Sequence, residues 1–160
     1  MESLTKKIQE LILADQNNIL PFRQGKISQV EITEKSQEIS GKFLEALKTY
    51  GFPYKDTVQE DIYKAGITLS LHLPLVDMEQ IFNDFIKNVP VDKINPEHKA
   101  IFVDKIRILS GKPQLYGTQY KIGKNHDVEL LPLENENDLE NIRKSAGLSP
   151  MLEYLKQIQK

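Results

Sequence analysis

The sequence contains no cysteine among its 160 residues. This absence excludes a disulfide framework, a zinc site built on thiolates and a cysteine nucleophile. A chain of this length can bury a sufficient hydrophobic core without such cross-links. The lack of cysteine fits a reducing compartment, and we therefore expect the protein to be cytoplasmic.

Long apolar runs are also missing. The most apolar window, Ile67–Val76, is interrupted by Pro74 and is far shorter than the roughly 20 residues that span a bilayer. The first 20 residues, Met1–Leu20, carry charged side chains throughout. We expect neither a membrane anchor nor a signal peptide, because both need an uninterrupted apolar stretch.

The sequence has no excess of one charge. Lysine and arginine number 21 and aspartate and glutamate 23, which gives a formal net charge of −2, and the two signs are mixed along the chain. Nucleic-acid binding depends on clustered basic residues, so we expect no nucleic-acid partner. A small molecule or another protein remains as the expected partner.

The motifs of phosphate-binding loops, dinucleotide-binding turns, zinc proteases and serine hydrolases are absent. The three histidines, His72, His98 and His126, lie far apart in the sequence. A zinc site needs three or four ligands held together, and their spacing does not indicate one. We expect no metal site, and the sequence indicates no cofactor.

Apolar residues recur at helical spacing through most of the chain. Ser28 and Glu31 form the pattern of a capping box, and Asn95-Pro96 is a strong helix start. We expect a helix to begin at each of the following positions: Ser3 (ending near Asn18, before Pro21), Ser28 (ending at Gly51), Asp56 (ending at Pro74), Asp77 (ending near Val89), Asn95 (ending at Gly111), Asn137 (ending at Gly147) and Ser149 (ending near Ile158).

The period changes to two residues between Gln114 and Ile122, which predicts a strand. Residues 123–127 supply a turn, and residues 128–133 return as a second strand, in which Pro132 is compatible only with a sheet edge or with the end of the strand. The predicted fold is mostly α: a single-domain helical bundle over residues 1–160, with one β-hairpin at about residues 113–134 packed on it.

His72 continues an apolar helical stripe that includes Ile62 and Leu69. An imidazole on such a face needs a hydrogen-bond partner. One interpretation is a core histidine that locks its helix to a neighbour. The other is a catalytic general acid or base, since histidine titrates near neutral pH.

The segment Gln114–Gln119 is the densest group of unusual residues. Glycine at position 117 weakens a strand and marks a close approach, and its neighbours Tyr116 and Thr118 form hydrogen bonds, as do both glutamines. One interpretation is a ligand-binding strand in which Gly117 leaves room for the ligand. The other is a helix packed into that gap.

Arg143 lies on a helix where it can clamp a carboxylate or phosphate, or form an internal ion pair. Asp15 and Gln16, near the end of the first helix, allow the same two interpretations. Together with Gln114, Tyr116, Gly117, Thr118 and Gln119, these three residues complete the candidate ligand-binding set.

On several of these residues the chain resembles an uncharacterised bacterial domain family. The resemblance covers nearly the whole sequence and implies a bacterial origin and a shared helical fold, but no reaction. The family has a Q-x-Y-G-T-Q hairpin and a tail of the form R-x-x-x-G-L-x-P-x-x-x-Y. The matching residues are Gln114 to Gln119, Arg143, Gly147, Leu148, Pro150, Tyr154, Asp15-Gln16, His72, Gln80 and Asp104-Lys105, where lysine replaces the family's arginine.

One departure from the family concerns the residues after the histidine. The family has aspartates there, where this chain has Pro74 and Val76. If those acids orient the histidine or bind a metal ion in the family, Asp77 would have to replace them here.

Three functions follow as hypotheses. The first is a ligand- or partner-binding domain that works through a pocket beside the hairpin. The second is a small hydrolase or transferase that uses His72 with Tyr116, Gln119 and Arg143. The third is an interaction protein of the immunity or antitoxin kind. We predict that these four side chains meet in one concave place, which would favour the first two hypotheses.

Overall fold

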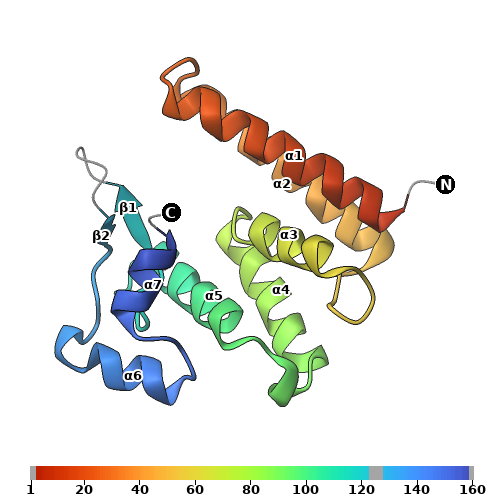
Figure 1. The fold of residues 1–160 in the computed structure, drawn as a ribbon. Helices are drawn as coiled ribbons and strands as arrows, with labels where there is room; N and C mark the ends of the chain where they lie inside the picture. Colours follow the sequence, from red (N-terminus) through yellow and green to blue (C-terminus); the bar gives the residue numbers. More distant parts are fainter. Residues whose placement is uncertain (1–2, 123–127, 159–160) are drawn as a thin grey trace. The chain divides into compact units, whose positions relative to one another are not determined.

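A computed structural model describes residues 3–122 and 128–158 of the chain. This part is mostly α, with seven α-helices and one antiparallel two-stranded hairpin (Figure 1), as the sequence predicts. The chain divides into two compact units, Met1–Pro74 and Leu75–Lys160. The single domain expected from the sequence remains a prediction.

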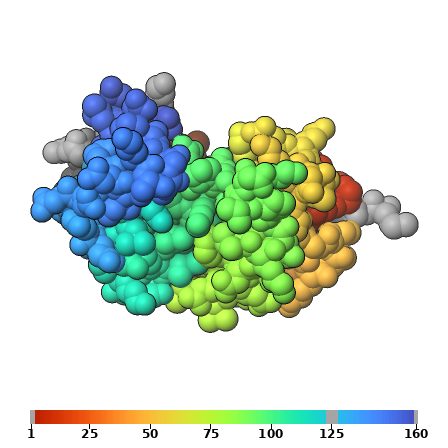
Figure 2. All heavy atoms as spheres, turned by 90° about the horizontal axis from the view of Figure 1, so that it is seen from below, coloured from red at the N-terminus to blue at the C-terminus, as the bar shows by residue number. Residues whose placement is uncertain are grey.

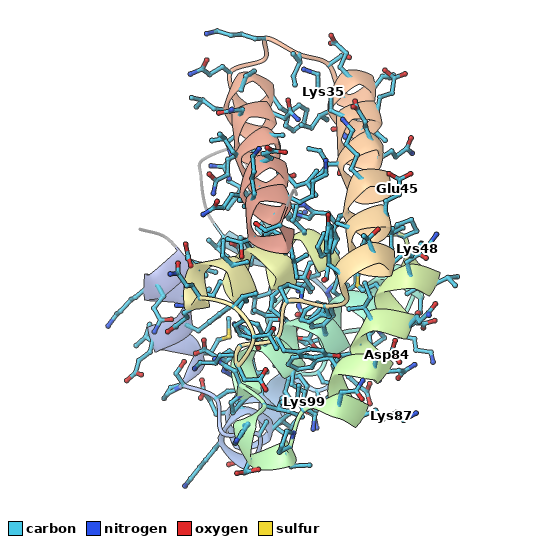
Figure 3. The ribbon with its side chains drawn as sticks, turned by 90° about the vertical axis from the view of Figure 1, so that its right-hand side faces the viewer. Lys35, Glu45, Lys48, Asp84, Lys87 and Lys99 are labelled. Carbon is cyan, nitrogen blue, oxygen red and sulfur yellow. The ribbon has the colours of Figure 1, made fainter. Side chains whose placement is uncertain are left out.

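The first unit consists of three helices, α1 (Leu4–Arg23), α2 (Gln29–Tyr50) and α3 (Glu60–Ser70). Helices α1 and α2 lie side by side along most of their length (Figures 1 and 3). Charged residues of α2 such as Glu45 and Lys48 point away from the ribbon (Figure 3). All three helices contribute apolar side chains to the core, among them Ile8, Leu11, Ile39, Phe43, Ile62 and Leu69.

The N-termini of α1 and α2 are capped as predicted. The Lys6 backbone N–H donates to the Ser3 hydroxyl at 3.3 Å. Ser28 and Glu31 form the capping box through two reciprocal bonds of 3.2 and 2.8 Å. The predicted end of α1 is wrong, because the helix continues through Pro21 to Arg23. A proline in the last turn removes only one helical hydrogen bond, so the helix tolerates it there.

The predicted bounds of α3 and of α4 (Leu75–Asn88) are also wrong. Asp56 does not cap α3, because residues 54–58 form a hydrogen-bonded turn and the helix begins at Glu60. It ends at Ser70, so His72 lies in a turn beyond the helix and not on its apolar face. Helix α4 begins at Leu75, directly after Pro74, which leaves Asp77 in its first turn.

The second unit contains the remaining helices and the hairpin. These elements are α4 (Leu75–Asn88), η1 (Val91–Lys93), α5 (Pro96–Leu109), β1 (Tyr120–Ile122), β2 (Val128–Leu130), η2 (Glu136–Asp138), α6 (Leu139–Ser145) and α7 (Met151–Ile158). Asn95 caps α5 as predicted, accepting a 2.8 Å bond from the Glu97 N–H. Phe82 of α4 stacks on Phe102 of α5 with ring centroids 5.4 Å apart.

The hairpin is shorter than predicted. Strands β1 and β2 pair Tyr120 with Leu130 and Ile122 with Val128. Residues 114–119, predicted as part of the first strand, form an irregular loop in which Gly117 has φ +73°. In Figure 2 the atoms of the C-terminal helices, drawn in blue, lie against the teal atoms of the preceding part of the same unit. The predicted turn at 123–127, including His126, lies outside the described residues.

Candidate functional site

Asp15 is an acidic residue on the buried face of α1. It follows Ile8 and Leu11 at helical spacing, and only 7% of its surface is exposed. A carboxylate in such surroundings needs a partner, because removing an unpaired charge from water is costly. The partner is His72, whose Nδ1 lies 3.3 Å from Asp15 Oδ1.

His72 is held from three directions although its ring remains partly exposed. Its carbonyl oxygen accepts a 3.2 Å bond from the Ser40 hydroxyl of α2, and its backbone N–H donates to Leu69 at the end of α3. The Asp15 carboxylate lies beside ring atom Nδ1, a contact that becomes an ion pair when the ring is protonated. In the neutral tautomer with its proton on Nδ1, Nε2 is a hydrogen-bond acceptor.

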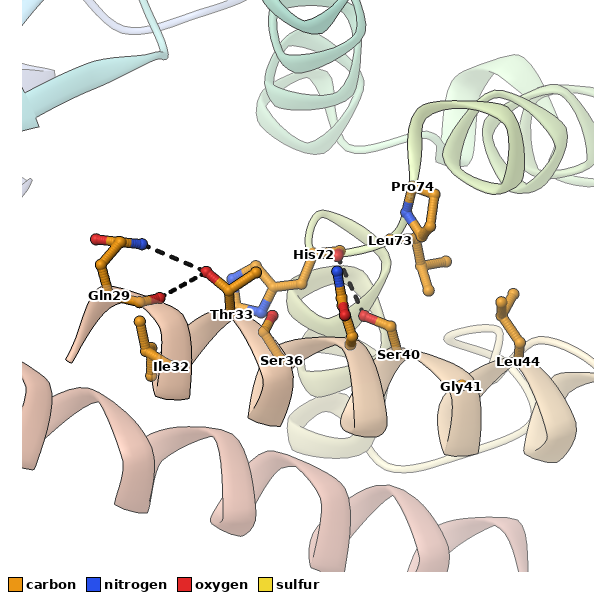
Figure 4. A pocket seen from close by; sticks show the side chains of 11 residues that line it. Gln29, Ile32, Thr33, Ser36, Ser40, Gly41, Leu44, His72, Leu73 and Pro74 are labelled. Carbon is orange, nitrogen blue, oxygen red and sulfur yellow. Dashed lines mark hydrogen bonds between the residues drawn. The ribbon is translucent and has the colours of Figure 1, made fainter. Parts of the chain in front are cut away.

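The ring borders a groove of about 670 Å³ that lies entirely within the first unit. This volume falls within the range of small-molecule sites. Figure 4 shows polar side chains of α2 along one part of the groove and apolar side chains near Leu44, Leu73 and Pro74 along the other. The polar lining residues are Gln29, Thr33, Ser36, Gln37, Ser40 and His72.

The polar residues other than His72 share one face of α2, because their spacing of three or four residues returns them to the same side of a helix. Part of the set is already ordered: the Thr33 hydroxyl donates to the Gln29 carbonyl at 2.7 Å. Among the described lining residues there is no Lys, Arg, Asp or Glu, and His72 is the only titratable side chain. The groove can therefore offer hydrogen bonds but carries no charge of its own apart from the Asp15–His72 pair.

In the second unit, Asp104 of α5 organises the loop that contains the candidate residues. This fully buried carboxylate accepts bonds from the backbone N–H groups of Leu115, Tyr116 and Thr118 at 2.7 to 3.2 Å. It also accepts a 2.8 Å bond from the Thr118 hydroxyl. The loop therefore wraps around one side chain and does not pair as a strand.

Gln114 has a comparable role at the start of this loop. Its buried side-chain amide donates to the carbonyls of Gln119 and Leu131 and accepts from the Gln119 N–H, all at 2.7 to 2.8 Å. Its backbone groups also pair, with Pro132 and Glu134. Every polar group of this residue, in the backbone and in the side chain, is hydrogen-bonded inside the fold.

Arg143 of α6 is 1% exposed and supports the same loop. Its Nη1 donates to the Tyr116 carbonyl at 2.6 Å and its Nε to the Ser149 carbonyl at 2.8 Å. The guanidinium lies 5.0 Å from the ring centroid of Tyr154. Burial lowers the pKa of Arg143, and burial is also the main cause that raises the pKa of Tyr154 to about 12.

Gly117 lies against helices. A Cβ atom there would be 3.2 Å from Met151 Sδ and 3.6 Å from a methyl carbon of Leu139, which agrees with the interpretation of a helix packed into the gap. The Tyr116 side chain lines a smaller pocket of about 290 Å³, together with Lys99 and residues of α6.

The structure thus joins the predicted site residues in two groups. Asp15 pairs with His72 in the first unit, where Gln16 is exposed on α1. Arg143 contacts Tyr116 in the second unit. The meeting of His72 with the residues of the second group remains a prediction.

Sequence reasoning missed the polar face of α2 and the central role of Asp104. The signal for the first was present, since hydroxyl and amide residues recur at helical spacing from Gln29 to Ser40. The second had no local signal beyond the resemblance at Asp104-Lys105, because the acceptor and its donors are 11 to 14 residues apart.

In comparisons with family models, curated proteins and solved structures, this chain has no significant match. Within residues 3–122 and 128–158, no group of three or more potential ligands is placed to hold a metal ion. In the same part of the chain, no helix has the length and apolar character needed to cross a membrane.

Proposed function

We propose that the protein binds a small molecule in the groove between α2 and the turn at His72. The observation that carries the proposal is the Asp15–His72 pair at 3.3 Å, on the edge of a groove of about 670 Å³. A buried carboxylate that orients a partly exposed imidazole toward a groove is a common arrangement at binding and catalytic sites.

The predicted pocket beside the hairpin has less support than this groove. The side chains of Gln114, Thr118 and Arg143 form hydrogen bonds within the protein and are buried. Polar groups that are already paired lose those bonds when they turn to a ligand. The groove beside His72 is also more than twice as large as the pocket at Tyr116, at about 670 against 290 Å³.

The test is a ligand-observed NMR screen of polar fragments, with binding located on ¹⁵N-labelled protein. We expect hits that shift the amides of Thr33, Ser36 and His72 in a saturable way. The variant His72→Ala should weaken these hits, whereas His98→Ala, which removes a histidine from the second unit, should not. A screen in which no fragment perturbs the groove amides would refute the proposal.

A second candidate function is acid–base catalysis at the same groove, as in the hydrolase or transferase hypothesis. It is favoured by the Asp15–His72 contact, because a carboxylate beside Nδ1 favours the tautomer whose Nε2 can take a proton from bound water or a hydroxyl group. Asp15 would act as a positioning residue. The participation of Tyr116, Gln119 and Arg143 remains a proposal.

The test of catalysis is hydrolysis of a panel of uncharged esters. The variant His72→Gln should abolish turnover while its thermal unfolding stays close to that of the wild type. Asp15→Asn, which keeps an acceptor for Nδ1–H, should leave measurable turnover. Equal rates for His72→Gln and the wild type would exclude His72 as the catalytic group.

A further inference from the structure

We infer that the groove selects an uncharged, hydroxyl-bearing molecule with an aliphatic portion and rejects anions. This inference rests on the proposed function and specifies its ligand class. Three features of the groove support this ligand class: the charge of the Asp15–His72 pair, the hydrogen-bonding groups of α2 and the apolar end of the groove.

The charge of the pair disfavours an anion in either protonation state of the ring. With neutral imidazole, Asp15 gives the pair a net charge of −1. With imidazolium, the pair has no net charge, because the carboxylate 3.3 Å away compensates the ring. The groove contains no Lys or Arg among its described lining residues, and phosphates and carboxylates are bound mainly by such cations.

The hydrogen-bonding groups match a hydroxylated ligand. In the tautomer of neutral His72 that carries its proton on Nδ1, beside Asp15, Nε2 accepts a hydrogen bond, which a ligand hydroxyl can donate. The Ser36 hydroxyl and the Gln37 amide lie on the same face of α2 and can each donate and accept. No hydrogen bond joins either side chain to another described residue, so both remain available to a ligand. A sugar or polyol hydroxyl, which also donates and accepts, complements all three groups.

The other end of the groove is aliphatic. Leu44 of α2 and the Leu73–Pro74 segment face each other there without a charged side chain (Figure 4). Burying an aliphatic chain against such surfaces is favourable by about 25 cal/mol for each Å² removed from water. The ligand therefore combines a polyhydroxyl head at His72 with an apolar tail near Pro74.

The test compares two probes that share a six-carbon tail, hexyl glucoside and hexyl phosphate, by NMR titration of the ¹⁵N-labelled full chain. We expect hexyl glucoside to shift the groove amides, and hexyl phosphate to bind at least about tenfold more weakly, a difference of about 1.4 kcal/mol. Glucose without the tail should also bind more weakly than hexyl glucoside.

Two serine and threonine variants provide a matched control. Ser36→Ala removes a hydroxyl group from the groove and should weaken binding of hexyl glucoside several-fold. Thr49→Ala removes a hydroxyl from the same helix outside the groove, where it is bonded to the Glu45 carbonyl at 3.0 Å, and should leave binding unchanged. Equal effects of the two variants would contradict the inferred contact with Ser36.

The outcomes separate this inference from the proposed function. If hexyl phosphate binds in the groove as tightly as hexyl glucoside, the groove is a binding site but the inferred ligand class is wrong. If neither probe nor any fragment of the screen perturbs the groove amides, both the ligand class and the proposed function are wrong.

Discussion

Replacing Asp104 tests how far one carboxylate stabilises the second unit. The side chain is fully buried and accepts hydrogen bonds from three backbone N–H groups and one hydroxyl. Each buried donor left without an acceptor costs roughly 1–3 kcal/mol. Asp104→Ala leaves three amides unsatisfied, which amounts to about 3–9 kcal/mol and approaches the whole stability of an ordinary domain.

The variant Asp104→Asn makes a more informative test, because one of its two terminal atoms still accepts. The Asn oxygen can still accept hydrogen bonds from the backbone N–H groups of Leu115 and Tyr116. In the wild type both N–H groups make their shortest bond to the same oxygen, Oδ1, at 2.7 and 3.1 Å. The Asn NH₂ group then faces the Thr118 N–H, which loses its acceptor. We expect the free energy of unfolding to fall by about 2–4 kcal/mol, because one donor is left unsatisfied and a neutral oxygen is a weaker acceptor than a carboxylate.

Hydrogen exchange followed by NMR, together with urea unfolding, measures this effect. In Asp104→Asn, the Thr118 amide should exchange much faster than in the wild type, and the urea midpoint should fall. Asp84→Asn is the control: Asp84 is an exposed acid on α4 (Figure 3), and its replacement should change stability by no more than about 0.5 kcal/mol. Wild-type protection of Thr118 and an unchanged midpoint in Asp104→Asn would refute the reasoning.

Three further predictions concern packing and titration. Gly66→Ala should destabilise the first unit despite the higher helix propensity of alanine, because the new Cβ would lie 2.5 Å from Pro53 Cγ. Gly41→Ala is the control: its Cβ would meet open space, and it should stabilise the unit by about 0.5–1 kcal/mol. Equal urea midpoints for the two variants would contradict this. Gly117→Ala should cost at least about 1–2 kcal/mol in urea unfolding, since its φ is +73° and a methionine sulfur lies 3.2 Å from the new Cβ; a wild-type midpoint would disprove it. The pKa of Tyr154 is raised to about 12 from 10.0. The unfolded chain therefore releases this proton at lower pH than the folded chain, and the free energy of unfolding falls as pH rises from about 10 to 12. Urea unfolding of Tyr154→Phe across that range should show a smaller fall, and pH profiles identical to the wild type would exclude the effect.

Features set by neighbouring residues were predictable from the sequence. The capping box at Ser28 and the helix start at Asn95-Pro96 are correct because both depend on bonds that span two or three residues. The general fold class is correct for a related reason, since helical periodicity extends over whole segments and survives small errors at their ends.

Features set by distant residues were not predictable in the same way. Residues 114–119 alternate as a strand does, but Asp104 captures their N–H groups and Gly117 turns the chain. Asp15 and His72 are 57 positions apart, so only the folded first unit brings them into contact. Each residue was a candidate site residue because of its side-chain chemistry, but no sequence pattern around either position indicated that the two would pair.

The side chain of Gln114 limits what evolution can place at that position. It performs the task of an extra peptide group, since its oxygen accepts from the Gln119 N–H and its nitrogen donates to the carbonyls of Gln119 and of Leu131 on the returning segment. Glutamate has no side-chain N–H to donate, methionine forms no comparable bond, and asparagine is one methylene shorter. Losing this glutamine therefore removes three hydrogen bonds that close the loop and join it to its neighbouring segment, and none of these three residues can restore all of them.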